Sequence, residues 1–222
     1  MIGVFDSGLG GLCALCEIHR LLPRESTVFL ADRENAPYGE RSESELIRLV
    51  SRDTERLALS GADRILVGCC TACTVLDKIP RELSELCTSI IEPTVREALS
   101  LTATGRIAVL CTEATKRSRI YERTALSIMP SAEAVTYAAG GLVRLVEGGM
   151  SDACIDDGGR ERLSSVLSGL NLAGCDTLIL GCTHFSHLER TLGDVLSIRT
   201  VSAARAGAEY FSKIIMKKSR GS

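Results

Sequence analysis

Short apolar runs recur along this chain, and longer segments with apolar residues at helical spacing separate them. The runs are rich in Val, Ile and Leu without polar alternation, which is typical of parallel strands covered on both faces. They predict strands near residues 2–5, 27–31, 64–67, 89–91, 107–110, 134–137, 177–180 and 199–201. Alternating strands and helices indicate a doubly wound α/β fold with mainly parallel sheets.

The helical signal is clear in residues 42–61, SESELIRLVSRDTERLALSG, and a similar pattern occupies residues 159–174. Ser42 is a suitable N-cap because Glu45 follows three residues later, and Gly61 is a suitable end of the helix. The segment therefore predicts a helix that begins after Ser42 and ends before Gly61.

Two strand-to-cysteine turns in the chain are near-duplicates. Residues 61–74 read GADRILVGCCTACT, and residues 173–186 read AGCDTLILGCTHFS. In each, an Asp stands six residues before the cysteine of a Gly-Cys pair, as Asp63 before Cys69 and Asp176 before Cys182. The repeat predicts two related α/β lobes, residues 1–94 and residues 95–202, with a C-terminal helix at 203–217 packed on the first.

Four chemistry-bearing residues stand at the carboxyl ends of predicted strands, namely Asp6, Cys69, Thr112 and Cys182. Ligands of open α/β sheets bind beyond these ends. We therefore expect the active site in the cleft between the lobes.

Composition narrows the possible partners. The 222 residues are 45% hydrophobic, with a net charge of -2 and a pI of about 6.0, so nothing favours nucleic acid as a partner. The start lacks the features of a signal peptide, and no apolar run approaches the ~18 residues that span a bilayer. We expect a cytoplasmic protein with no membrane partner, whose ten cysteines are mostly reduced and in part simply buried.

Cys69 and Cys182 are the candidate reactive thiols. A single cysteine after a buried strand is commonly a structural thiol, but two at equivalent turns favour a function. A strand–turn–helix junction also supplies a helix N-terminus, which favours the thiolate. His184, two residues after Cys182, is placed to tune that thiol or relay protons to it.

Metal and nucleotide sites are weaker alternatives. Cys70 and Cys73 have C-x2-C spacing, but no second such pair exists and the H-x2-H of His184 and His187 is not a standard ligand set. The glycines of DSGLGG resemble a phosphate loop, yet the dinucleotide fingerprint needs Gly where Cys13 stands. We expect these glycines instead to let backbone amides approach a small anion.

A matched pair of acid/base groups suits inversion at a carbon centre. One group removes a proton from one face and the other returns a proton to the opposite face, and the reverse reaction exchanges their roles. A thiol has a pKa of about 8.5, so one thiolate and one thiol can coexist after modest shifts. The interpretation needs no cofactor and no metal.

Seven motifs, in order, carry a resemblance over nearly the whole chain. They are IGVFDSGLGGL, ADRENAPYGERS, VGCCTACT, IIEPTVREA, CTEATKRSRIY, LVRLVEGG and LILGCTHF. Together they resemble the glutamate racemases of the aspartate/glutamate racemase superfamily.

The resemblance implies cofactor-independent interconversion of L- and D-glutamate, which supplies D-glutamate for peptidoglycan, by an enzyme that tends to form dimers. It implies that Cys69 deprotonates the D enantiomer and Cys182 the L enantiomer, with assistance from Asp6, His184 and Glu147. The residues implied to bind substrate are Ser7, Pro37, Tyr38, Gly39, Cys70, Thr71, Thr112, Thr115 and Thr183.

The chain departs from the family pattern at Cys70, where Cys-Asn-Thr is usual, and also at Cys111 and Ser186. A thiol is a weaker hydrogen-bonding group than the Asn amide, so Cys70 is expected to weaken substrate binding or change the substrate. Two alternatives to glutamate racemisation follow: a racemase or isomerase of the same superfamily acting on aspartate or another small acid, and a catalytically weak binding or regulatory protein.

Overall fold

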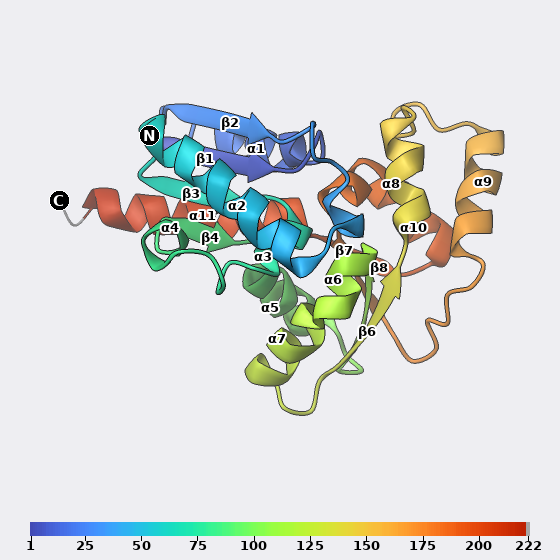
Figure 1. The fold of residues 1–222 in the computed structure, drawn as a ribbon. Coiled ribbons are helices and arrows are strands. Elements are labelled where there is room, and N and C mark those ends of the chain that lie inside the picture. Colours follow the sequence, from blue (N-terminus) through green and yellow to red (C-terminus); the bar gives the residue numbers. More distant parts are fainter. Residues whose placement is uncertain (221–222) are drawn as a thin grey trace.

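A computed structural model describes the backbone of residues 1–220 and the side chains of residues 1–217. It contains two four-stranded sheets with every strand pair parallel, ordered β2-β1-β3-β4 and β6-β5-β7-β8 (Figure 1). Helices flank both sheets, so the predicted α/β fold is confirmed. The strands are β1 Ile2–Asp6, β2 Thr27–Ala31, β3 Arg64–Val67, β4 Cys87–Ser89, β5 Arg106–Cys111, β6 Glu133–Ala138, β7 Thr177–Gly181 and β8 Arg199–Ser202.

The helices fall between and after the strands. Those of the first half are α1 Gly11–Leu21, η1 Tyr38–Glu40, α2 Glu43–Leu59, α3 Cys70–Cys73, α4 Arg81–Ser84 and α5 Ile91–Leu101, of which η1 is a 3-10 helix. Those of the second half are α6 Glu113–Ser118, α7 Ile120–Ile128, α8 Gly140–Glu147, α9 Asp157–Leu167, the 3-10 helix η2 Thr183–Leu188, α10 Glu189–Leu196 and α11 Ala203–Arg220.

Local sequence accounts for most of these bounds. Every residue of β1 and β7 is buried, as expected of apolar runs without alternation. The Ser42 hydroxyl accepts from the Glu45 N–H and the Glu45 carboxylate accepts from the Ser42 N–H, so the predicted capping box starts α2. Gly61, just after the helix, has a φ of 93°, which glycine adopts without strain.

The strand predicted at 89–91 is wrong in position. The strand β4 ends at Ser89, Ile90 is the N-cap residue of α5, and Ile91 is its first residue. The Ser89 hydroxyl accepts a hydrogen bond from the Ile91 N–H, which turns the chain into the helix. A buried Ile-Ile pair looks the same in a strand and at the start of a buried helix, so apolarity could not separate the two. The other seven predicted strands match within one residue.

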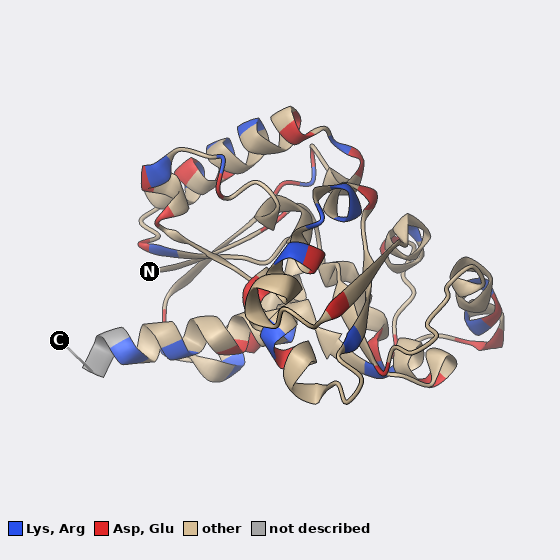
Figure 2. Cartoon of the chain, turned by 90° about the horizontal axis from the view of Figure 1, so that it is seen from below, with Lys and Arg blue, Asp and Glu red and all other residues tan. Residues whose placement is uncertain are grey.

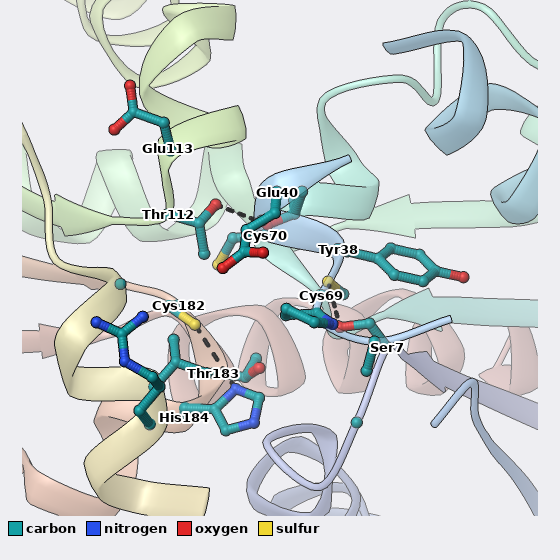
Figure 3. Close-up of a pocket in the computed structure, with 18 of the residues that line it drawn as sticks. Ser7, Tyr38, Glu40, Cys69, Cys70, Thr112, Glu113, Cys182, Thr183 and His184 are labelled. Atoms are coloured by element: carbon teal, nitrogen blue, oxygen red, sulfur yellow. Dashed lines mark hydrogen bonds between the residues drawn. The ribbon is translucent and has the colours of Figure 1, made fainter. Parts of the chain in front are cut away.

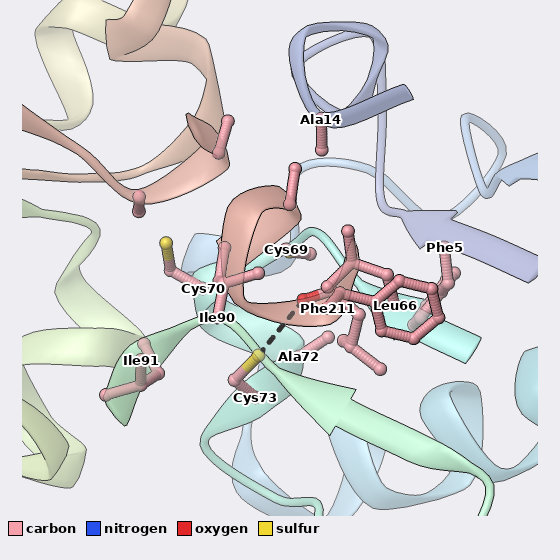
Figure 4. Packing of buried hydrophobic residues seen from close by; sticks show 14 of the residues in the cluster. Phe5, Ala14, Leu66, Cys69, Cys70, Ala72, Cys73, Ile90, Ile91 and Phe211 are labelled. Atoms are coloured by element: carbon pink, nitrogen blue, oxygen red, sulfur yellow. Dashed lines mark hydrogen bonds between the residues drawn. The ribbon is translucent and has the colours of Figure 1, made fainter. Parts of the chain in front are cut away.

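The helix α11 lies against α1 and α5, and it appears in red behind the strands of the first sheet in Figure 1. Its side chain Phe211 is fully buried near Phe5 and Leu66 of the first sheet (Figure 4). A Cβ on Gly207 would lie 2.2 Å from Ile90 Cγ2, so α11 and the start of α5 are in direct contact. These contacts join the end of the chain to its first half.

The predicted lobe boundary between residues 94 and 95 falls inside α5. One hydrophobic cluster includes Ile65 from the first sheet and Ile107 and Val201 from the second. The sheets thus share a core, and the division into two domains stays a prediction.

The outer helices carry Lys and Arg mixed with Asp and Glu rather than a face of one sign (Figure 2). No helix in the described part of the chain has the length and apolar character needed to cross a membrane.

Candidate active site

The two sheets place matching residues at matching strand ends. The neighbours β1 and β3 end near Asp6 and Cys69, and the neighbours β5 and β7 end near Thr112 and Cys182. The equal strand orders mean that β1 corresponds to β5 and β3 to β7. The repeated Gly-Cys turn therefore occupies the same position in both sheets.

These strand ends surround a cavity of about 320 Å³. Figure 3 shows Cys69 and Cys182 on opposite sides of it. Twelve of the residues assigned to the site from the sequence line the cavity: Ser7, Pro37, Tyr38, Gly39, Cys69, Cys70, Thr71, Thr112, Glu147, Cys182, Thr183 and His184. The other two, Asp6 and Thr115, lie behind this lining and hydrogen-bond to residues in it.

Cys69 lies on the first-sheet side and is 5% exposed. Its Sγ lies 3.4 Å from the Ser7 hydroxyl oxygen. Burial and then the negative charge of Asp6 raise the pKa of the Cys69 thiol to about 11, against the hydrogen bond from Ser7. The Cys69 thiol is thus protonated at neutral pH.

Cys182 lies on the second-sheet side of the cavity, opposite Cys69, and is 7% exposed. Its Sγ lies 3.7 Å from His184 Nδ1. Burial raises the pKa of this thiol well above its usual value, against a hydrogen bond from the His184 backbone. The two thiols therefore have different partners, a hydroxyl for Cys69 and an imidazole for Cys182.

The imidazole of His184 connects Cys182 with an acid on α8. His184 Nε2 lies 3.3 Å from Glu147 Oε1, but the geometry is not that of a hydrogen bond, and Nε2 is buried without any other partner among the described residues. A buried, unpaired ring nitrogen is rare unless a ligand or a proton transfer uses it.

Asp6 is fully buried and joins the two halves of the site. Its carboxylate accepts from the Gly8 N–H and from the Thr183 hydroxyl, each at 2.8 Å. Burial raises the pKa of Asp6, while the charge of His184 and these hydrogen bonds oppose the rise. A Cβ on Gly10 would lie 2.4 Å from Thr183 Oγ1, so glycine is required for this close approach of the loop after β1.

Three threonine hydroxyls form a second contact between the halves. Thr71 Oγ1 lies 2.9 Å from Thr112 Oγ1 and 3.3 Å from Thr115 Oγ1, and the latter two are 3.0 Å apart. Each hydroxyl can donate or accept, so the cluster can rearrange its protons toward a bound carboxylate.

A buried ionic network holds the turn formed by residues 37–39 against the cavity. The Tyr38 hydroxyl donates to Asp32 Oδ2 at 2.7 Å and to Asp53 Oδ2 at 3.0 Å. Arg52 donates to both carboxylates, at 2.8 and 2.9 Å. A Cβ on Gly39 would lie 2.7 Å from Thr112 Cβ, so the turn also presses on the second half. The network fixes a wall of the site with buried charges.

Comparison with known proteins shows which family the chain belongs to. The sequence profile of the Asp/Glu/Hydantoin racemase family matches residues 18–211. The chain belongs to this racemase family. It is 36% identical over 217 residues to a glutamate racemase from Geobacter metallireducens, covering 96% of this chain and 79% of that one.

Solved structures of the racemase family have the same fold. A glutamate racemase isoform from Bacillus anthracis matches with a TM-score of 0.85 and 31% identity, covering 98% of this chain and 82% of that one. A glutamate racemase from Francisella tularensis, solved with D-glutamate, matches with a TM-score of 0.88 at 22% identity over 98% of this chain and 81% of that one, which shows the fold alone.

The racemase cavity of this chain includes the departure at Cys70. Its side chain is buried, and its Sγ accepts a hydrogen bond from the Tyr121 hydroxyl at 3.4 Å. Burial and then the neighbouring Cys182 raise the pKa of Cys70 well above its usual value. Cys70 therefore offers the cavity a neutral thiol.

All ten cysteines are free thiols. Within the described residues, no group of three His, Cys, Asp or Glu side chains is arranged to hold a metal ion.

Sequence reasoning missed several residues of this racemase site. Arg144, Glu40 and Glu113 line the cavity, and Asp32 and Arg52 support its wall. Arg144 stands three residues before the assigned Glu147, a spacing that places both side chains on one face of a helix, so this spacing was a signal in the sequence that could have pointed to it. Asp32 and Arg52 are 20 residues apart in the sequence. The periodicity of apolar residues gives no information about a contact between two such polar side chains.

Proposed function

We propose that this chain interconverts L- and D-glutamate without a cofactor, using Cys69 and Cys182 as paired acid/base groups. The observation that carries the proposal is the position of the two thiols at equivalent strand ends on opposite sides of one cavity. A substrate carbon held between them presents one face to each sulfur. The names of the glutamate racemases that resemble the chain support glutamate as the substrate.

In the proposed reaction, Cys69 removes the Cα proton of D-glutamate and Cys182 delivers a proton to the opposite face, giving L-glutamate. The reverse reaction exchanges the roles. Because burial raises the pKa of each thiol, forming the reactive thiolate requires a positive charge close to the sulfur, and the substrate ammonium supplies it.

Three neighbouring groups assist the thiols in this proposal. Asp6 balances the substrate ammonium, His184 shuttles the proton of Cys182, and Glu147 orients the His184 imidazole from 3.3 Å. Hydroxyls of Thr71, Thr112 and Thr115 stabilise the charge that develops on the α-carboxylate as the proton leaves. The remaining binding groups are proposed to be Ser7, Pro37, Tyr38, Gly39, Cys70 and Thr183, all of which line the cavity.

The biological setting is proposed on the family resemblance. It comprises a cytoplasmic homodimer that supplies D-glutamate for peptidoglycan.

Proton NMR in D2O tests the reaction. Each glutamate enantiomer, incubated with the protein under reducing conditions, is expected to lose its Cα proton signal while the circular dichroism decays toward zero. Cys69→Ser and Cys182→Ser are each expected to slow racemisation by about 100-fold or more, since general acid–base groups contribute factors of this size. Cys16→Ser, at an exposed thiol outside the cavity, is the matched control. Retention of the Cα signal by both enantiomers would rule out glutamate racemisation.

The thiol of Cys70 favours a second candidate, a racemase or isomerase for aspartate or another small acid. The same NMR experiment on those acids separates the two, because faster exchange of another acid than of glutamate would select the second. Binding without any Cα exchange would instead leave a catalytically weak binding or regulatory protein.

A further inference from the structure

The contact between Glu147 and His184 joins two elements, because Glu147 is the last residue of α8 and His184 lies in η2. His184 Nε2 and Glu147 Oε1 are 3.3 Å apart without the geometry of a hydrogen bond. Their separation is therefore set by whatever holds the end of α8 against η2, and not by a bond between the two side chains.

Packing fixes the beginning of α8 more firmly than its end. The buried residues of the helix, Leu142 and Val143, lie in its first half, whereas Glu147 is exposed. The chain then continues through Gly148 and Gly149, and Gly149 has a φ of 96°. Because consecutive glycines add backbone freedom, the Glu147 end of the helix needs an anchor farther along the chain.

Asp152 supplies such an anchor with four hydrogen bonds. Its backbone N–H donates to the carbonyl oxygen of His187, near the end of η2, at 2.8 Å. Its carboxylate accepts from the Arg190 and Thr191 N–H groups, each at 2.9 Å. Its carbonyl oxygen accepts from the Arg190 guanidinium at 2.9 Å. The segment that follows α8 is thereby tied to the end of η2 and to the start of α10.

The carboxylate of Asp152 also caps α10. The amides of Arg190 and Thr191 belong to the first turn of this helix, whose N-cap residue, Leu188, has an apolar side chain. A carboxylate at a helix N-terminus satisfies amides that lack a partner within the helix and interacts favourably with the helix dipole. The cap therefore comes from a residue that precedes α10 by more than 35 positions, and it holds two distant segments together.

We propose that Asp152 is a positioning residue that holds Glu147 beside His184. The pair in turn serves the proton transfers of Cys182. This role depends on the proposed function for the part that Cys182 plays, and it adds the residue that keeps the proton relay of that thiol in place. Asp152 is half-buried and does not line the cavity, so it acts through the relay and not through the substrate.

A double-mutant cycle tests whether Asp152 acts through Glu147. Asp152→Ala removes both side-chain hydrogen bonds and is expected to lower kcat for glutamate by about 10-fold, since misplacing a group by 1 Å costs about 10²-fold. KM is expected to stay within about 2-fold, because the groups that bind substrate are unaltered. Asp152→Asn keeps one capping oxygen and is expected to recover part of the loss.

The decisive comparison uses the Glu147→Gln background. There Asp152→Ala is expected to change kcat by less than about 2-fold, because the group that Asp152 positions has already been altered. If the two substitutions instead lowered kcat independently, so that their effects multiplied, the proposal would be overturned.

Asp156→Ala is the matched control. Asp156 lies on the same loop, accepts from the Gly159 N–H at 2.7 Å as the N-cap of α9, and does not line the cavity. Both variants lose a capping carboxylate, so both are expected to lower the thermal midpoint of unfolding, whereas Asp156→Ala is expected to leave kcat unchanged. Equal losses of kcat in Asp152→Ala and Asp156→Ala would overturn the proposal as a general effect of loosening the loop.

The ring signals of His184 in NMR spectra give a measurement that requires no turnover. The chain has three histidines, so these signals are assigned by the loss of the other two sets in His19→Gln and His187→Gln. In Asp152→Ala they are expected to move toward their positions in Glu147→Gln, because both substitutions take the carboxylate away from Nε2.

His184 signals that do not move in Asp152→Ala would also overturn the proposal. A protein in which they move, but which does not racemise glutamate, would contradict the proposed function and leave the positioning role of Asp152 intact.

Discussion

At the scale of single residues, the site is defined by thiols whose surroundings differ. Cys69 lies beside the Ser7 hydroxyl, and Cys182 lies beside the His184 imidazole. Cys70 lines the cavity and accepts a hydrogen bond from the Tyr121 hydroxyl. The sequence predicted the first two from their repeated turn. It could not predict that Tyr121 donates to Cys70, because the two residues lie on different elements 51 positions apart.

Cys70 is the residue at which a gain of activity is expected. An Asn at this position keeps an acceptor for the Tyr121 hydroxyl and replaces the weak S–H donor with a stronger amide donor. One hydrogen bond is worth ~0.5–1.5 kcal/mol, so Cys70→Asn is expected to raise kcat/KM for glutamate by about 2- to 10-fold. Steady-state racemisation monitored by circular dichroism measures it.

Cys70→Ala is the control for that variant and is expected to show no gain, since it adds no donor. A lower kcat/KM for glutamate in Cys70→Asn, with unchanged folding, would contradict the prediction and favour a pocket shaped for another acid.

At the scale of elements, the short turn at η1 depends on a network the sequence did not reveal. Its residues Pro37, Tyr38 and Gly39 were assigned to the site from the family motif, and they do line the cavity. Their position is set by Asp32, Arg52 and Asp53, which come from the end of β2 and from the middle of α2. Contacts between elements of this kind lie outside what periodicity can report.

Tyr38→Phe tests the network. Removing the hydroxyl takes one donor from each of two buried carboxylates, which keep their hydrogen bonds from Arg52. This loss is expected to cost about 1–3 kcal/mol of unfolding free energy. The displaced turn is expected to raise KM for glutamate by about 10-fold through lost positioning. Urea denaturation and steady-state kinetics measure the two effects.

Tyr210→Phe, at an exposed tyrosine on α11, is the control and is expected to change neither quantity. If Tyr38→Phe matched that control in stability, the shared hydroxyl would have no role in holding the turn.

At the scale of the whole molecule, the duplication predicted from two cysteine turns is present in the strand orders of both sheets. The Asp of the repeated turn also has the same role in both sheets, because it accepts hydrogen bonds from the segment before the neighbouring strand. Asp63, just before β3, accepts from the Met1 amine ahead of β1, and Asp176, just before β7, accepts from Thr102 and the Ala103 N–H ahead of β5. The hydrophobic core shared by the two sheets could not be predicted, because the repeat implies two lobes and gives no information on how they pack.

The contact at Asp176 predicts a pH dependence of stability. Hydrogen bonds from the Thr102 hydroxyl and from the Ala103 and Thr104 amides lower the pKa of Asp176 to about 2, below its ordinary value of 3.8. Because the folded pKa is the lower one, the folded state favours the ionised form. The stabilisation is therefore complete above about pH 4 and is lost as the pH falls toward 2.

Asp176→Asn is expected to lower the unfolding free energy at pH 7 and to narrow its difference from the parent chain as the pH approaches 2. Thermal unfolding between pH 2 and pH 7 measures this. Asp77→Asn, at an exposed carboxylate, is expected to follow the parent curve. A constant difference between Asp176→Asn and the parent across this range would refute the linkage.

The unlike partners of the two thiols have a thermodynamic consequence for the proposed racemisation. Mirror-image amino acids have equal free energies in water, so the equilibrium constant between them is unity whatever the catalyst. The ratio of kcat to KM must then be the same in both directions, although Ser7 serves one sulfur and His184 the other. The asymmetry can therefore emerge only as a higher turnover balanced by a higher KM for one enantiomer, and no change at either thiol can make the enzyme run one way.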